Sequence, residues 1–314
     1  MILALVTVIL PVFLVIAFGA GAVRGRVISA GAIDGVMLYA QGFALPCVLF
    51  RGIVNLDLGA VFDWRLLGSF YTGAILCFVL GILGARRIFH ARPGESVAIG
   101  FAALFSNSLL LGVPIMSRAY GADSLAPNFA IISIHAPLCY LIGITTMEFS
   151  RADGRGLKDT ARAIARALFR NALMIGLGLG FLVNLSGLTL PEPVTIAVDM
   201  IADSALPAAL FGLGGVLTRY SLHAQLGEAG LIAGLSLLVH PAVAFLLSHH
   251  VFGLPPEFVR SAVVTAAMAP GVNAYVFASL YARAQAEAAS AVLLATGLSV
   301  VTVTGWLALL DAVL

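Results

Sequence analysis

Hydrophobic stretches of roughly 20 residues, separated by short polar or basic segments, run along the whole chain. A transmembrane helix needs about 20 mainly apolar residues, so the pattern predicts ten membrane-spanning helices. Their expected positions are 2–22, 32–50, 66–84, 95–117, 126–149, 168–187, 194–216, 228–247, 258–281 and 286–310. The longest hydrophilic interval, 150–166, is expected to be a loop that connects two five-helix halves, 1–149 and 167–314.

Composition supports a membrane environment for all of these segments. Hydrophobic residues make up 61% of the chain, charged residues only 10%, and the mean hydropathy is +1.06. A soluble domain carries about 25% charged residues. We therefore expect an all-α integral membrane protein in which the lipid bilayer surrounds the helices and no soluble domain is left over.

The few basic residues predict an orientation. Only four of the 17 Lys and Arg residues, namely Arg51, Arg65, Arg118 and Arg260, fall on one side of the ten-helix pattern. Because basic loops stay in the cytoplasm, the other side, which includes the 150–166 loop, is predicted to be cytoplasmic. Both termini are then predicted to lie outside the cell. The protein itself is expected in the plasma (inner) membrane. Arg162, Arg166 and Arg170 recur every four residues, which predicts a basic stripe along the headgroups or simply a topology signal.

Polar residues, glycine and proline interrupt the fourth and the ninth predicted spans. The first interruption reads SNSLLLGVP, from Ser106 to Pro114, and the second reads APGVNAY, from Ala269 to Tyr275. Each lies about 12 residues into its span, or roughly 18 Å at 1.5 Å per residue, near the centre of a core about 30 Å thick. Broken helices at this depth occur where protein or a water-filled cavity satisfies the freed backbone groups.

Such breaks favour an anion site, because each half-helix begins with unpaired N–H groups and a partial positive charge. We expect substrate contacts from Asn107, Gly112 and Pro114 in the fourth span. In the ninth span we expect them from Pro270, Gly271 and Asn273. Asn107 and Asn273 supply amide donors. The alternative is that Pro114 and Pro270 only kink their helices.

An internal repeat relates the two halves. Ala44-Leu45-Pro46 matches Ala205-Leu206-Pro207 at an offset of 161 residues, and Tyr120 matches Tyr281 at the same offset. Five is an odd number of spans, so the second copy is predicted to be inverted in the membrane. Pro46 and Pro207 are expected to support the scaffold of the site.

Two intramembrane ionisable residues are candidates for ion coupling. Asp203 is predicted to lie near the bilayer centre with no Lys or Arg in its own span, where a carboxylate usually marks an ion or proton pathway. His135 has a similar predicted depth and could carry a proton, although a structural histidine bonded to a backbone carbonyl is the alternative. Asp199 and His240 fit structural roles better.

Other chemistry has little support. The single lysine, Lys158, follows Leu157, so it does not complete a phosphate-binding loop, and the three cysteines do not form a metal-ligand pattern. We expect no cofactor, no metal, no nucleic-acid partner and no enzymatic activity. Two alternatives stay open: an intramembrane hydrolase using Asp199 and Asp203 or a serine with His135, and a receptor or assembly module that does not transport.

The segments SNSLLLGVPIMSRAYG and MAPGVNAYVFASLYA resemble the two crossover motifs of the auxin efflux carrier family. The two Ala-Leu-Pro elements and the ten spans are similar as well, so the resemblance covers the whole chain and suits a bacterial member. It implies a homodimer in which spans 1, 2, 6 and 7 form a scaffold. Spans 3–5 and 8–10 would then form a transport domain that moves like an elevator.

The resemblance also implies a small organic anion as substrate, such as malonate, malate or an auxin-like acid. A sodium symporter of the bile-acid type, which shares the inverted ten-helix plan, is the alternative within transporters. Where plant members place an acidic residue near the proline of the second span, this chain has Gln41 and Gly42. That part of the plant site cannot be transferred. The substrate, the coupling ion and the direction of transport stay open.

Overall fold

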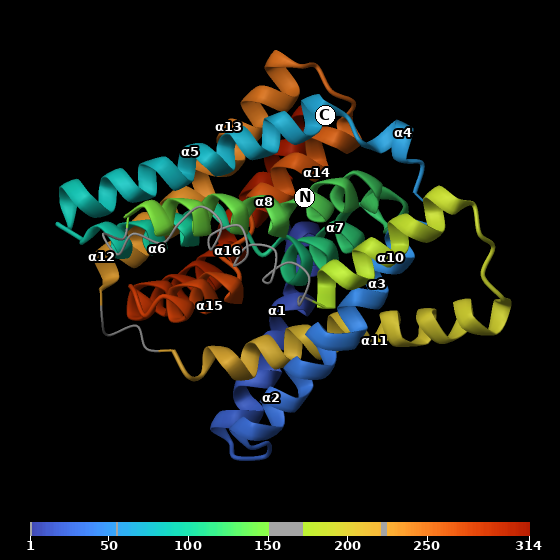
Figure 1. Cartoon of the computed structure of the whole chain (residues 1–314), viewed down its shortest axis with the longest axis horizontal. Helices are drawn as coiled ribbons and strands as arrows, with labels where there is room; N and C mark the ends of the chain where they lie inside the picture. The colour runs from blue at the N-terminus through green and yellow to red at the C-terminus, as the bar shows by residue number, and fades with distance from the viewer. Residues whose placement is uncertain (1, 55, 151–171, 221–224) are drawn as a thin grey trace. The chain divides into compact units, whose positions relative to one another are not determined.

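The computed structural model describes residues 2–54, 56–150, 172–220 and 225–314. These residues fold as helices joined by short turns, with one isolated β-bridge between Ser106 and Pro270 (Figure 1). Six of the described helical segments are long and apolar enough to cross a membrane. The expected 150–166 loop and the Arg162–Arg166–Arg170 stripe lie outside the described residues.

Helices occupy every interval in which a span was predicted. The first five intervals contain α1 (Ile2–Arg24), α2 (Ala30–Tyr39) with η1 (Ala40–Ala44) and α3 (Leu45–Val54), α5 (Trp64–Ile88), α6 (Pro93–Leu104) with η2 (Ser108–Gly112) and α7 (Val113–Tyr120), and η3 (Ala122–Leu125) with α8 (Ala126–Ser150). The other five contain α10 (Ala172–Ser186), α11 (Glu192–Leu217), α12 (Leu226–Gly234) with η4 (Leu235–Val239), α13 (His240–Phe245) and η5 (Leu246–Val251), α14 (Pro256–Ala266) with α15 (Val272–Leu280), and α16 (Gln285–Val313). A short helix, α4 (Leu58–Val61), was not expected.

The helices form two compact units, and each unit takes helices from both halves of the chain. Unit 1 comprises 1–10, 62–160 and 220–314, and unit 2 comprises 11–61 and 161–219. Apart from the first residues of α1, unit 2 therefore holds spans 1, 2, 6 and 7, and unit 1 holds spans 3–5 and 8–10. This is the division that the family resemblance implies for scaffold and transport domain.

Close backbone contact holds α10 against α3 in unit 2. A Cβ on Gly176 would collide with the backbone of Pro46, and one on Gly180 would lie 3.0 Å from Ile53 Cβ. Small residues four apart are the usual way in which membrane helices approach this closely. At the end of the contact, Asn184 donates from Nδ2 to the carbonyls of Ile53, Val54 and Leu56 at 2.8–2.9 Å, which satisfies the C-terminal end of α3.

Three π-helical turns precede prolines in the same way. η1, η2 and η4 each end two residues before a proline, at Pro46, Pro114 and Pro241 respectively. Proline has no N–H to donate to the carbonyl four residues earlier, so the helix widens and the residue before the proline bonds five residues back. Pro207, the sequence counterpart of Pro46, instead lies inside the continuous helix α11.

Asp63 is the N-cap of the long helix α5 in unit 1, and it lies just outside the membrane-spanning segment. Its side chain accepts hydrogen bonds from the Arg65 N–H at 2.7 Å and from the Arg65 guanidinium at 2.6–3.1 Å. The side-chain bonds from Arg65 are the main cause that lowers the pKa of the Asp63 carboxyl. An N-cap of this kind stabilises a helix by about 1 kcal/mol.

We expect Asp63→Ala to lower the thermal unfolding midpoint of the purified protein, because the first turn of α5 loses its cap. Asp63→Asn keeps the cap but not the charge, so it should lower the midpoint less. The pKa of Asp63 is lower in the folded than in the unfolded state, so its ionised carboxylate stabilises the fold above the unfolded-state pKa. This stabilisation is lost as the pH falls through the folded-state pKa. The parent should therefore lose its advantage over Asp63→Asn at acidic pH, and equal midpoints for all three at neutral pH would contradict the cap.

Candidate functional site

The two interrupted spans break and cross inside unit 1. α6 ends at Leu104 and η2 begins at Ser108, while α14 ends at Ala266 and α15 begins at Val272. The first half-helices have 12 and 11 residues, so each break lies about 16–18 Å from the start of its span. The sequence therefore located both breaks correctly, and the tertiary structure brings them together.

Two backbone hydrogen bonds join the crossing segments. The Asn107 N–H donates to the Ala269 carbonyl at 2.8 Å, and the Gly271 N–H donates to the Phe105 carbonyl at 3.1 Å. Between them, Ser106 faces Pro270 in an antiparallel bridge. Because the flanking residues make both bonds, the missing N–H of Pro270 costs no ladder bond here. The crossing thus provides hydrogen-bond partners for backbone N–H and C=O groups that lack intrahelical partners where the two helices are broken.

Beyond the crossing, two helix N-termini start from the joined segments. The Asn107 carbonyl accepts from the N–H groups of Leu111 and Gly112 at 3.1 Å, and the Gly271 carbonyl accepts from Ala274 at 2.9 Å. The N–H groups at the start of η2 and α15 have no partner within their own helices. Such groups, together with the helix dipole, favour an anion by about 0.3–1 kcal/mol each, and up to about 2 kcal/mol when partly buried.

Polar side chains gather at this crossing. Asn107 is 6% exposed and Ser106 3% exposed, and the Ser106 hydroxyl has no hydrogen-bond partner among the described residues. Gly271 lies directly against Asn107, since a Cβ placed on it would be 3.6 Å from Asn107 Cα. Asn273, half-buried, is the second residue of α15. The structure therefore groups Asn107, Pro270, Gly271 and Asn273 around one crossing.

Gly112 and Pro114 lie further from it. Gly112 closes the π-helical turn η2 and Pro114 is the second residue of α7, both buried one turn or more beyond the crossing. Their expected contact with substrate stays a prediction. Their observed contribution is local, because Pro114 accounts for the π-helical turn that carries the N-terminus.

His135 lies behind the crossing in a buried aromatic cluster. It is 2% exposed, and its ring centroid lies 4.8 Å from Phe105, 5.5 Å from Phe70 and 6.1 Å from Tyr71. The Cys139 sulfur is 3.7 Å from its Nδ1 atom. Because Phe105 is itself part of the crossing, one of the two coupling candidates contacts the proposed site.

Sequence reasoning missed a buried polar triad next to the crossing. Asn128 donates from Nδ2 to the Thr265 hydroxyl at 2.7 Å and accepts from the Ser261 hydroxyl at 2.8 Å, and all three residues are 0% exposed. The triad fastens α8 to α14, the half-helix that leads into the second break. Its signal in the sequence was an asparagine in an apolar span and a Ser–Thr pair one helical turn apart.

Asp203, the other coupling candidate, belongs to unit 2 and has a cationic partner there. Arg51 Nη1 lies 2.8 Å from Asp203 Oδ1 and 3.4 Å from Asp199 Oδ1. Sequence reasoning considered only partners in the same span, whereas this one comes from α3. The Asp203 side chain is 71% exposed, so the pair is open to its surroundings. Asp199 takes part in the same ion-pair cluster.

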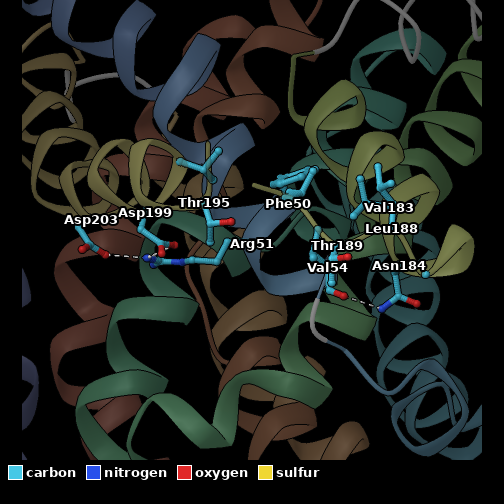
Figure 2. Close-up of a pocket in the computed structure, with 13 residues that line it drawn as sticks. Phe50, Arg51, Val54, Val183, Asn184, Leu188, Thr189, Thr195, Asp199 and Asp203 are labelled. Atoms are coloured by element: carbon cyan, nitrogen blue, oxygen red, sulfur yellow. Dashed lines mark hydrogen bonds and ion pairs between the residues drawn. The ribbon is translucent and has the colours of Figure 1, made fainter. Parts of the chain in front are cut away.

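These three charged residues form one end of a cavity of about 740 Å³ within unit 2 (Figure 2). At the opposite end, Val183 and Leu188 lie close to the uncharged polar residues Thr189 and Asn184. The lining residues are Phe50, Arg51, Val54, Val183, Asn184, Gly187, Leu188, Thr189, Leu190, Thr195, Val198, Asp199 and Asp203. The cavity therefore combines an ion-pair cluster that carries one net negative charge with a wall of apolar and uncharged polar residues.

Comparison with known proteins identifies the class. A family model described as "Membrane transport protein" matches residues 4–307. The chain therefore belongs to this family of transporters, the auxin efflux carrier family, as its crossover motifs indicated. It is a multi-pass membrane transport protein and not an enzyme.

Individual relatives are distant. A Rhizobium meliloti (strain 1021) protein named "Putative malonate transporter" is 25% identical over 271 residues, which cover 85% of this chain and 83% of the relative. An "Uncharacterized transporter" of Methanothermobacter thermautotrophicus is 26% identical over 66% of each chain. The mouse "Lysosomal cholesterol signaling protein" is 28% identical over 73% of this chain but only 25% of its own length.

The Asn128 triad provides a test of how the site is supported. Asn128→Ala leaves the Ser261 and Thr265 hydroxyls without their buried partner, which should cost about 1–3 kcal/mol and lower the thermal unfolding midpoint. Thr302→Ala removes only a 3.4 Å bond within α16 and serves as the control. If both variants unfold at the parent's midpoint, the triad does not fasten α8 to α14.

Proposed function

We propose that this protein carries a small organic anion across the membrane, and that the anion binds at the crossing of the two broken helices. A carboxylate such as malonate, malate or an auxin-like acid fits this proposal. The observation that supports it best is the pair of helix N-termini that start from one crossing, because the first N–H groups of a helix lack the usual intrahelical partners and favour an anion. The name of the Rhizobium relative favours malonate as the first compound to test.

The amides of Asn107 and Asn273 are proposed to add donors to these N-termini. Asn107 precedes η2 and Asn273 follows the start of α15, so each half-helix contributes one amide next to its N-terminus. A carboxylate accepts several hydrogen bonds, and bonds to a charged group are stronger than neutral ones. Ser106, buried beside Asn107 with its hydroxyl unpartnered among the described residues, is proposed as a further donor.

Several finer features belong to the same proposal. We propose ten membrane-spanning helices arranged as two inverted five-helix repeats, with both termini outside and the 150–166 loop in the cytoplasm. Unit 1 contains the crossing, and we propose that it moves like an elevator against unit 2, which acts as the scaffold with Pro46 and Pro207. A homodimer in the plasma membrane completes the proposal. The grouping of helices into the two compact units supports this division of roles.

Replacement of the two amides tests the binding site. Asn107→Ala and Asn273→Ala should each weaken malonate binding about ten- to a hundredfold, because a hydrogen bond to a charged group contributes about 1.5–3 kcal/mol. Uptake of labelled malonate by proteoliposomes and thermal-shift titration measure the effect. Ser279→Ala changes an exposed residue of the same half-helix α15 and is the matched control. Parent-like binding and uptake in both asparagine variants would place the site elsewhere.

A second test concerns coupling. If Asp203 is the coupling residue, as the sequence predicted, Asp203→Asn should flatten the pH dependence of uptake while substrate binding survives. Asp34→Asn is the control, since Asp34 forms another aspartate–arginine pair of unit 2, with Arg219 at 2.7 Å. A full pH response in Asp203→Asn would move the coupling role to His135, and a parent indifferent to a pH gradient would indicate transport without proton coupling.

A further inference from the structure

Three buried polar residues lie at four- and eight-residue intervals along the helical segment from α12 to η5. Ser236 is 1% exposed, and His240 and Ser248 are both fully buried. Among the described residues, Ser236 Oγ, His240 Nδ1 and Ser248 Oγ find no hydrogen-bond partner. A buried polar atom without a partner costs about 1–3 kcal/mol, and native proteins contain few of them. Three in one segment of unit 1 therefore call for a physical explanation.

The backbone around these residues is better satisfied than the side chains. η4 places its π-helical turn just before His240 and Pro241, which displaces carbonyls from their normal partners. The indole N–H of Trp306 donates to the Leu237 carbonyl at 2.9 Å, and the Cys77 thiol to the Leu235 carbonyl at 3.4 Å. The neighbouring helices thus supply hydrogen-bond donors for two carbonyls of the π-helical turn. They supply no partner for Ser236 Oγ or His240 Nδ1 among the described residues.

The contacts of His240 define its tautomer. Its Nε2 atom lies 3.0 Å from the Phe70 carbonyl, which can only accept, so Nε2 carries the hydrogen and Nδ1 presents a lone pair. The ring packs on Phe70 at 4.7 Å, and Gly73 leaves room for it, since a Cβ there would lie 2.8 Å from His240 Cδ2. The imidazole is therefore held in place with an available acceptor atom.

Ser236 lies one turn before this acceptor. A buried serine in a helix commonly bonds a carbonyl of the preceding turn, as Ser299 does with Thr296 at 2.7 Å, whereas Ser236 makes no such bond within the described part of the chain. Residues four apart on a helix are neighbours on its surface, with about 5–6 Å between their Cβ atoms in an α-helix, and one water molecule spans a gap of this size. Ser248 lies about 12 Å further along and is too far away to share that water.

We propose that Ser236 and His240 bind one buried water molecule, and that His240 accepts a proton through it. The water donates one hydrogen bond to His240 Nδ1, and a second bond joins it to the Ser236 hydroxyl. Transfer of a proton to Nδ1 gives an imidazolium whose Nε2–H still bonds the Phe70 carbonyl, so no other contact of the ring has to break. The ligand of the site is thus water, or water with an excess proton.

Titratable groups in contact with this site come from α5 and α8, and α14, which also packs against α13, carries Glu257 and Arg260. His135 lies on the same Phe70 ring, at 5.5 Å, with Tyr71 and Cys139 next to it, and Cys77 bonds the Leu235 carbonyl. From α14, Ser261 and Thr265 are uncharged and already bonded to Asn128. His240 and His135 therefore form a pair of imidazoles separated by one aromatic ring, and a role for the pair in proton coupling rests on the proposed transport function.

Thermal unfolding of the purified protein tests the water without using transport. If Ser236 Oγ binds a water, Ser236→Ala should lower the unfolding midpoint by about 2–4 °C, since one bond of the site is lost. Ser299→Ala, which removes a buried hydroxyl bonded within its own helix, should change the midpoint less. An unchanged or raised midpoint for Ser236→Ala overturns the proposal, because removal of a truly unpartnered hydroxyl relieves a cost.

Nitrogen NMR of the reconstituted, ¹⁵N-histidine-labelled protein tests the acceptor. His240→Gln assigns the His240 signals, and His249→Gln serves as the control because His249 lies in the same segment but stacks on Phe245. We expect an unprotonated Nδ1 that receives magnetisation from water. A protonated Nδ1 at neutral pH, or no transfer from water, overturns the site. Neither measurement needs substrate, so a parent that transports none of the proposed carboxylates would refute the proposed function and leave this result standing.

Discussion

The structure depends on the need to pair every backbone N–H and C=O group that an apolar surrounding leaves without water. Two interrupted helices would each violate this requirement alone. The bonds from Asn107 to Ala269 and from Gly271 to Phe105 satisfy both interruptions at once, and they hold the two N-termini at one crossing. The feature that makes the broken helices tolerable therefore also creates the candidate anion site.

The same requirement explains the polar side chains elsewhere in the two units. Asn184 satisfies the last carbonyls of α3, Trp306 satisfies a carbonyl displaced by a π-helical turn, and the Asn128 triad pairs hydroxyls with an amide. Each of these residues pairs with a group far away in sequence. Where such pairing is incomplete among the described protein atoms, as at Ser106, Ser236 and His240, the structure points to a ligand or to water.

The ionisable residues near the candidate sites differ in chemical type and in partners between the two units. In unit 2, Arg51 neutralises part of the charge of Asp199 and Asp203 at the end of a cavity, so an acidic residue in a membrane span is stabilised by an ion pair. In unit 1, the cluster behind the crossing contains imidazole, phenol and thiol groups rather than carboxylates. The two coupling candidates therefore occupy different chemical surroundings, one charged and exposed and the other neutral and buried.

The sequence by itself determined the membrane class, the helix intervals and the positions of both breaks, because hydrophobic length and proline placement act locally. It also indicated the family through SNSLLLGVP and APGVNAY, and the family match confirmed it. Only the tertiary structure decided which groups meet. The partner of Asp203 lies 152 residues away at Arg51, and the partner of Asn128 lies 137 residues away at Thr265. Helical periodicity carries no information on such pairs, since they depend on how helices from both halves of the chain pack together.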